Sequence, residues 1–148
     1  MVGIVTAALC VGFAAGATAT AVGIGIGFDP TGLMIFGAQT EVPLGESLDM
    51  RAQVGFATQE IAGLMLASVG IFAHRVFEPI DPYIGIGVGA AITPPPFSTG
   101  ITLEGTAGVR VIAFEPVCLF LQAHYLLRWS PGGWTSGPIY EGGIQVHF

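Results

Sequence analysis

Apolar and polar residues alternate with a period of two along most of this chain, which is the spacing of a β-strand whose two faces differ. The clearest segment is 48–58, in which the first face holds Leu48, Met50, Ala52, Val54 and Phe56, and the second holds Asp49, Arg51, Gln53, Gly55 and Ala57. A slip of one residue would move Asp49 and Arg51 to the apolar face, so the register of this strand is strongly specified.

Seven further segments follow the same pattern and are separated by short runs rich in Gly and Pro. Together they predict about eight strands, near 21–28, 33–42, 48–58, 63–76, 83–91, 102–111, 118–129 and 139–148. The fourth segment is the least regular, because Leu64, Leu66 and Phe72 fall on its polar side. We expect a β-bulge or a contact with a partner there.

Composition indicates what the apolar face contacts. Hydrophobic residues make up 52% of the 148 residues and charged residues only 9%, whereas a soluble domain is about 25% charged. Beyond the first 21 residues there is no uninterrupted apolar run of about 20 residues, as a membrane helix would need, and the 23 Gly and 10 Pro disfavour helices. The sequence therefore predicts an all-β fold, an antiparallel up-and-down transmembrane β-barrel with short loops and a small polar interior.

The first segment of the chain differs from the rest. Residues 1–21 are typical of a signal peptide, with an apolar core followed by small residues and A-x-A sites at 17–19 and 19–21. No Lys or Arg precedes the core, which leaves an uncleaved helix or an extra strand as the alternative. We expect a signal peptide at 1–21 and a barrel at 22–148.

Charge and cysteine content exclude several classes of function. The net charge is −6, with four Arg and no Lys, so we expect no nucleic-acid partner. Cys10 lies in the leader-like segment, which leaves Cys118 alone in the body of the chain. The three His residues are scattered, and we expect neither a metal nor a cofactor.

The polar faces of the predicted strands point into the barrel. They carry Gln39, Glu41, Asp49, Arg51, Gln53, Glu104, Arg110, Gln122, His124, Arg128, Glu141, Gln145 and His147. Charges in a confined interior must pair or contact water. We expect Arg51 to pair with Asp49 or Glu41.

The same reasoning pairs Arg110 or Arg128 with Glu104 or Glu141. Such a network of ion pairs and hydrogen bonds would plug the interior, because a barrel of eight strands is just wide enough for its own side chains. The alternative is a narrow path for protons, ions or water.

Aromatic residues are predicted to mark the two membrane interfaces. Trp129 and Trp134 flank the last outer loop, while Tyr83, Tyr140 and Phe148 are expected near the other rim. This distribution is typical of two aromatic girdles, and ordinary core aromatics are the alternative.

Three motifs carry a resemblance to a known family: PYIGIGVG at 82–89, GVRV at 108–111 and the ending at 140–148. With them, residues 21–148 resemble the small eight-stranded outer-membrane barrels of the OmpA/OmpX kind. The resemblance implies a bacterial outer membrane and contact with a lipid bilayer. It also implies that the barrel-insertion machinery reads the terminal strand, whose apolar face holds Tyr140, Ile144, Val146 and Phe148.

The loops depart from that family, because the connections expected at 29–32, 58–62, 93–100 and 130–138 are short. They leave little surface for an adhesin or a receptor, and we expect a structural, anchoring or envelope-complex role, with other envelope proteins as partners. The alternatives are a narrow pore, an outer-leaflet lipid-modifying enzyme or a soluble barrel that binds an apolar ligand.

Two residues bear on the alternative of a lipid-modifying enzyme. His124 and Glu141 suggest a hydrolase, but Leu126 stands where a Ser nucleophile would be needed. We therefore expect no catalysis. The polar face is also too poor in charge to coat a soluble barrel.

Overall fold

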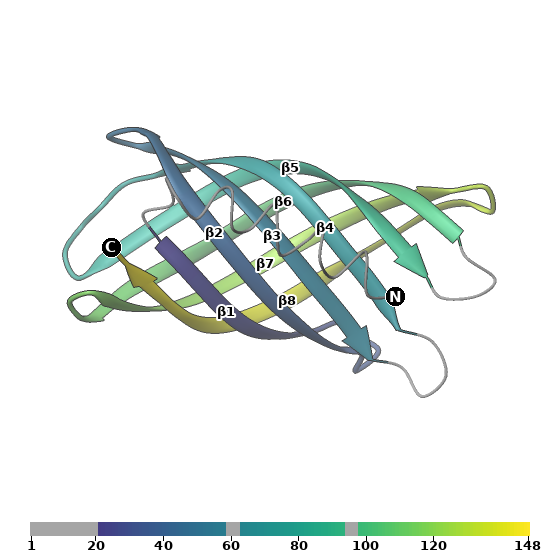
Figure 1. Cartoon of the computed structure of the whole chain (residues 1–148), viewed down its shortest axis with the longest axis horizontal. Coiled ribbons are helices and arrows are strands. Elements are labelled where there is room, and N and C mark those ends of the chain that lie inside the picture. Colours follow the sequence, from purple (N-terminus) through teal and green to yellow (C-terminus); the bar gives the residue numbers. More distant parts are fainter. Residues whose placement is uncertain (1–20, 59–62, 94–97) are drawn as a thin grey trace.

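The computed structural model describes residues 21–58, 63–93 and 98–148, and these form a closed barrel of antiparallel strands in chain order (Figure 1). The strands are β1 (Ala21–Phe28), β2 (Met34–Gly45), β3 (Leu48–Thr58), β4 (Leu64–His74), β5 (Ile80–Thr93), β6 (Ser98–Phe114), β7 (Val117–Ser130) and β8 (Gly133–His147). The predicted eight-stranded up-and-down barrel is confirmed. Among the described residues, no helix is long and apolar enough to cross a membrane.

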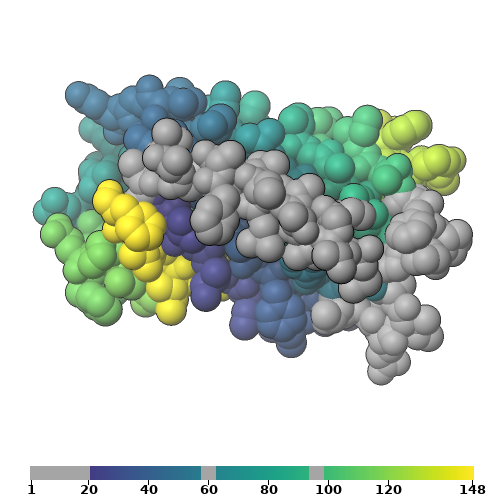
Figure 2. Space-filling model, in the orientation of Figure 1, coloured from purple at the N-terminus to yellow at the C-terminus, as the bar shows by residue number. Residues whose placement is uncertain are grey.

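The barrel closes where β1 pairs with β8, from Ala21 opposite His147 to Phe28 opposite Tyr140. In Figure 2 the end of β8, in yellow, lies beside β1, in purple. We call this the terminal end, because β1 begins and β8 finishes there, and the opposite one the far end. The connections β2–β3, β4–β5 and β6–β7 lie at the terminal end, and the turns β1–β2 and β7–β8 lie at the far end.

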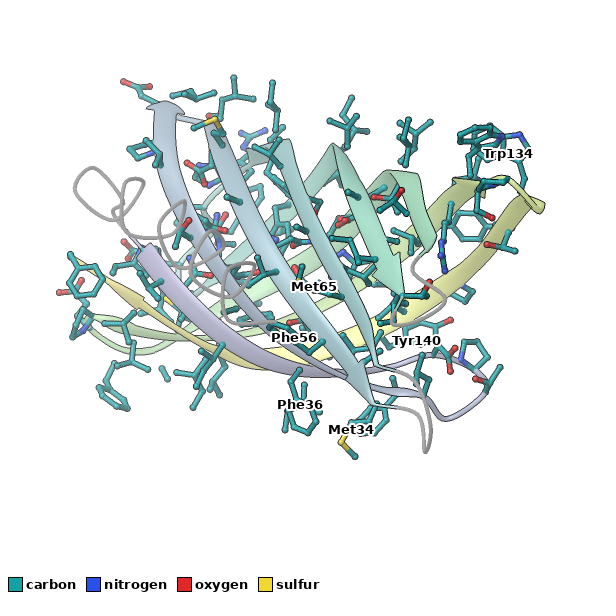
Figure 3. The ribbon with its side chains drawn as sticks, turned by 45° about the vertical axis from the view of Figure 1, so that its right-hand side comes forward. Met34, Phe36, Phe56, Met65, Trp134 and Tyr140 are labelled. Atoms are coloured by element: carbon teal, nitrogen blue, oxygen red, sulfur yellow. The ribbon has the colours of Figure 1, made fainter. Side chains whose placement is uncertain are left out.

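The outer wall is apolar on every strand. One exposed side chain from each, in chain order, is Ile24, Phe36, Phe56, Ile71, Ile86, Leu103, Leu121 and Ile144. Ile86 is 75% exposed, and Figure 3 shows Met34 and Phe36 projecting away from the barrel. An apolar surface that surrounds the whole barrel is expected against acyl chains and not against water.

Glycines on the inner face make room for large interior side chains. A Cβ atom at Gly85 would overlap the ring of Phe72, and one at Gly108 would overlap Tyr83 and Gln122. These side chains therefore occupy the space that a Cβ atom would take, so the interior holds more side-chain volume than a wall lined by Cβ atoms would allow.

The irregular fourth segment forms a regular strand. β4 pairs with β3 and β5 without a register shift, so the β-bulge expected there is wrong. Phe72 faces inward and is only 3% exposed, because the interior offers it a cationic partner described below. Register shifts occur instead between Pro43 and Gly45 and between Ile112 and Phe114, beside the terminal-end turns.

The connection between β7 and β8 is tighter than expected. The predicted loop at 130–138 is wrong, because Ser130 already pairs with Gly133 and Trp129 pairs with Trp134. In the connection between β1 and β2, Asp29 Oδ1 accepts hydrogen bonds from Thr31 and Leu33. The hydroxyl of Thr31 is the main reason why the pKa of Asp29 lies below its ordinary value.

Candidate functional site

Polar side chains fill the interior. Those that are buried come from β2, β3, β5, β6, β7 and β8 and comprise Gln39, Glu41, Asp49, Arg51, Asp81, Thr102, Glu104, Thr106, Arg110, Gln122, His124 and Gln145. Each lies at an inward position of its strand, so the alternation that exposes the apolar wall also gathers these groups. They form two clusters, a terminal cluster that contains two arginines and a far cluster that contains a histidine.

The terminal cluster consists of Glu41, Asp49, Arg51, Asp81 and Arg110. Its centre is Glu41, whose Oε1 accepts a hydrogen bond from Arg51 Nε at 2.7 Å. The other carboxylate oxygen, Oε2, pairs with Arg110 Nη1 at 2.5 Å. One carboxylate therefore balances part of the charge of two guanidinium groups. Arg51 pairs with Glu41, which is one of the two partners expected for it.

The second half of the terminal cluster surrounds Arg110. Its Nη2 lies 2.7 Å from Asp81 Oδ2 and 3.4 Å from Asp49 Oδ2. His74 adds to the cluster, with Nδ1 at 3.1 Å from Asp81 and Nε2 at 3.6 Å from Asp49. The expected pairing of Arg110 with Glu104 or Glu141 is wrong, because Arg110 reaches three other carboxylates at the terminal end.

Two aromatic rings complete the surroundings of Arg51. The guanidinium carbon lies 4.0 Å from the centroid of Phe72 and 4.6 Å from that of Tyr83, a geometry in which the ring faces attract the cation. The Tyr83 hydroxyl donates a hydrogen bond of 2.7 Å to Gln122 Oε1, which also accepts from Arg51 Nη1 at 2.8 Å. Tyr83 is 2% exposed, so its expected place in an aromatic girdle is wrong.

The far cluster is centred on Glu104 and His124. Glu104 accepts hydrogen bonds from Gln53 at 2.8 and 2.9 Å, from Ser68 at 3.2 Å and from Thr106 at 2.7 Å. His124 Nδ1 lies 2.5 Å from Glu104 Oε1. The cluster thus joins β3, β4, β6 and β7 across the interior.

Amide side chains link the two clusters. Gln122 Nε2 donates to Glu141 at 3.0 Å, while its Oε1 accepts from Arg51 as described above. Gln145, which is fully buried, donates to Glu41 at 2.6 Å and accepts from Gln39 at 3.2 Å. Charges at the two ends of the barrel are therefore connected by one continuous hydrogen-bonded network.

Two expected members of the interior set lie outside this network. Arg128 is half-buried, and among the described residues it forms no ion pair, so the pairing expected for it with Glu104 or Glu141 is wrong. His147 is half-buried at the terminal end, and its Nε2 is buried without a hydrogen-bond partner.

The network divides the interior into two spaces. A cavity of about 50 Å³ is lined by Glu104, His124 and Glu141, among others, and it has room for water but not for a solute. A larger space of about 480 Å³ opens at the terminal end, where Glu41, Asp49, Asp81, Arg110 and His147 line it. The terminal cluster and its aromatic rings lie between these two spaces.

Some interior residues were not anticipated. His74, Asp81, Ser68 and Thr106 all take part in the network. The alternation with a period of two would have placed two of them inward. Asp81 stands two residues before the inward Tyr83, and His74 stands two residues after Phe72. Within the described ranges, no group of three His, Cys, Asp or Glu could hold a metal ion.

The other aromatic residues that were expected at the two rims are exposed on the outer surface. Trp129 and Trp134 form a cross-strand pair at the tip of the β7–β8 hairpin, and Figure 3 shows Trp134 at that tip. Tyr140 pairs with Phe28, the last residue of β1 before the far-end turn. Its expected place at the terminal rim is therefore wrong, whereas Phe148 does lie at the terminal end.

Comparison with known proteins gives the fold a context. No protein-family model matches the sequence, and no curated protein is significantly similar to it. Neisserial surface protein A superposes with a TM-score of 0.62 at 15% identity, covering 86% of this chain and 94% of that one. The N-terminal β-barrel domain of Pseudomonas aeruginosa OprF gives a TM-score of 0.67 at 12% identity, covering 88% and 98%.

A third similar structure, the outer membrane enzyme PagL, has a TM-score of 0.60 at 12% identity and covers 86% of this chain and 99% of that one. At such low identity these similarities establish the fold and nothing more. This chain has the fold of the small outer-membrane β-barrels.

Proposed function

We propose that this chain is a small barrel of the bacterial outer membrane, with a structural or anchoring role and an interior that is closed to solutes. The observation that carries the proposal is the terminal cluster, in which Arg51 and Arg110 share Glu41 across the interior. The fold and the apolar outer wall support the location, because such a wall requires lipid.

The closed interior favours this role over transport. A solute that crossed the barrel would have to break the contacts of Arg51 with Glu41, Gln122 and two aromatic rings. Leaving a buried charged or polar group without its partner costs more free energy than the intact pair contributes to stability, so the network resists opening. The barrel therefore adds an apolar wall to the membrane and no channel.

The enzyme alternative has less support. Both ring nitrogens of His124 already contact carboxylates, which leaves neither free to accept a proton from a nucleophile. The nearest hydroxyl, that of Thr106, contacts Glu104 and lies inside the barrel, where acyl chains have no access. PagL is an enzyme by its own description, but the similarity to it extends to the fold alone.

Planar-bilayer conductance tests the closed interior. We expect the purified protein to insert without conducting, and the paired variant Glu41→Ser/Arg51→Ser to conduct, because it removes the central ion pair without leaving a lone charge. Ile86→Val on the outer wall is the matched control and should remain silent. Steady conductance by the unmodified protein would contradict the proposal.

The anchoring role predicts neighbours in the envelope. On the outer wall, a Cβ at Gly105 would meet no atom within 4 Å, and two residues further along β6 Ala107 pairs with Ala123 of β7. A partner's surface could approach the backbone closely there. Photo-cross-linking from Ala107 in intact cells should capture an envelope protein, whereas the same group placed at Ile24 should not. Equal capture from both positions would argue against a specific neighbour.

A further inference from the structure

His124 lies between two carboxylates that belong to neighbouring strands. Its Nδ1 is 2.5 Å from Glu104 Oε1 on β6, and its Nε2 is 3.1 Å from Glu141 Oε2 on β8. The residue is 4% exposed, so the ring and both of its contacts are shielded from bulk water. The imidazole ring therefore bridges the strands on both sides of β7.

The chemistry of the bridge determines the charge of the ring. An ionised carboxylate only accepts hydrogen bonds, and a neutral imidazole carries a single N–H. Glu104 is ionised in this geometry, because Gln53, Ser68 and Thr106 all direct donors at its two oxygens. Glu141 likewise accepts from an amide donor, that of Gln122. Two carboxylate contacts require two N–H groups, and only the imidazolium supplies them.

The other groups around the ring supply no second cation. On β3 and β4, Gln53 and Ser68 are neutral, and so is Thr106 on β6. Arg51 is linked to the far cluster only through Gln122, whose amide oxygen accepts a hydrogen bond from Arg51 Nη1. His124 is therefore the one group that directly balances the charges of Glu104 and Glu141 among the residues described.

We propose that His124 is a proton-dependent clamp: as an imidazolium it holds β6, β7 and β8 together at the far half of the interior, and it releases Glu141 when it loses a proton. Glu141 is the contact that is released, because it is the longer one and because Glu104 keeps its neutral donors. The terminal cluster contains arginines, which stay charged, so that half of the interior remains closed.

The direction of the pH dependence follows. The clamp stabilises the barrel while the ring carries both protons, and this contribution is lost as the pH rises and one proton leaves. Release would widen the cavity of about 50 Å³ that His124 and Glu141 line. The clamp rests on the closed interior proposed above, but its protonation state can be measured without reference to conductance.

A variant with a single histidine allows a direct test. The chain has three His residues, so His74→Gln/His147→Gln, expressed without a histidine tag, leaves only His124. We expect ¹⁵N spectra of its ring at about pH 8, where an ordinary histidine is neutral, to show both nitrogens protonated. A neutral ring with one bare nitrogen would overturn the clamp. Conductance together with a doubly protonated ring would refute the closed interior and leave the clamp intact.

Unfolding by urea in the same background tests the consequence. We expect the urea midpoint to fall as the pH is raised from about 6 to about 10. His124→Arg should abolish that fall, because a guanidinium can serve both carboxylates at every pH. Glu141→Gln should reduce the fall, because only Glu104 then requires an N–H from the ring and a neutral imidazole can supply it. An unchanged pH profile in either variant would count against the proposal, and the ring spectra decide it if a variant does not fold.

Discussion

The central carboxylate of the terminal cluster allows the sharpest test of the energetics. Glu41→Gln keeps the shape of the side chain and removes the charge that serves both Arg51 and Arg110. Arg110 keeps Asp81 at 2.7 Å and Asp49 at 3.4 Å. Arg51 keeps only the amide of Gln122 and the faces of two aromatic rings, so it becomes a buried cation without a counter-ion.

The expected loss of stability follows from this difference between Arg51, which loses its counter-ion, and Arg110, which keeps two. Removing one partner of a buried ion pair costs about 3–5 kcal/mol, mostly because the other charge is left uncompensated. We expect Glu41→Gln to lower the free energy of unfolding by that amount. Asp81→Asn should cost less than half as much, because Arg110 retains Glu41. Arg51→Met in the Glu41→Gln background should restore most of the loss, because it removes the orphaned charge.

Reversible urea unfolding in detergent micelles or vesicles measures these differences, with the fluorescence of Trp129 and Trp134 as the signal. A double-mutant cycle compares the unmodified protein, Glu41→Gln, Arg51→Met and the double variant. It isolates the coupling free energy between the two residues. A loss below about 1 kcal/mol for Glu41→Gln would refute the reasoning, since it would fall in the range of an exposed pair. So would additive effects of the two substitutions.

Three further outcomes are expected. Gly85→Ala should lower the free energy of unfolding by about 1–3 kcal/mol through overlap with Phe72, whereas Gly105→Ala should be neutral because its Cβ would face open space; equal effects in urea unfolding would contradict this account. Ile86→Arg should cost about 2–4 kcal/mol if the position lies near the bilayer midplane, and no cost in vesicles would place this wall outside the membrane. Deletion of Phe148 should reduce the heat-modifiable barrel in cells without blocking export, and full assembly of the truncated chain would argue against its role as a signal.

The periodicity of the sequence predicts the barrel and the inward face of most of its strands. The alternation in 48–58 fixes which face of β3 is inward, and in the folded barrel Glu41 stands directly opposite Arg51 on β2. This neighbouring position is why the pair could be proposed from the sequence. A local pattern suffices here, because adjacent antiparallel strands bring residues of like parity together.

Contacts across the barrel could not be predicted in the same way. Arg110 lies on β6 and reaches Glu41 on β2, four strands away, so its reach depends on the width of the interior and on the glycines that line it. Another of its partners, Asp81, is its direct neighbour on β5. It was missed because Pro82 suggested a later start for that strand, although a strand can carry a proline near its first residue.

Turn residues misled the prediction at the far end. Pro131, three glycines and Pro138 suggested a loop of nine residues, but only a tight turn separates β7 from β8. Gly133 adopts a φ of 114°, which lets the chain reverse there. Pro138 lies within β8 opposite Tyr125. The sequence alone did not reveal that the paired tryptophans next to this turn extend the hairpin.

The most direct test of the whole account is the environment of consecutive positions along β3 in a lipid bilayer. Spin labels placed one at a time at positions 52 to 56, with both native cysteines replaced by serine, report collisions with oxygen dissolved among the acyl chains and with a water-soluble nickel chelate. We predict high oxygen accessibility at Ala52, Val54 and Phe56, and low oxygen accessibility at Gln53 and Gly55. The opposite alternation, or none at all, would contradict an apolar wall around a polar interior.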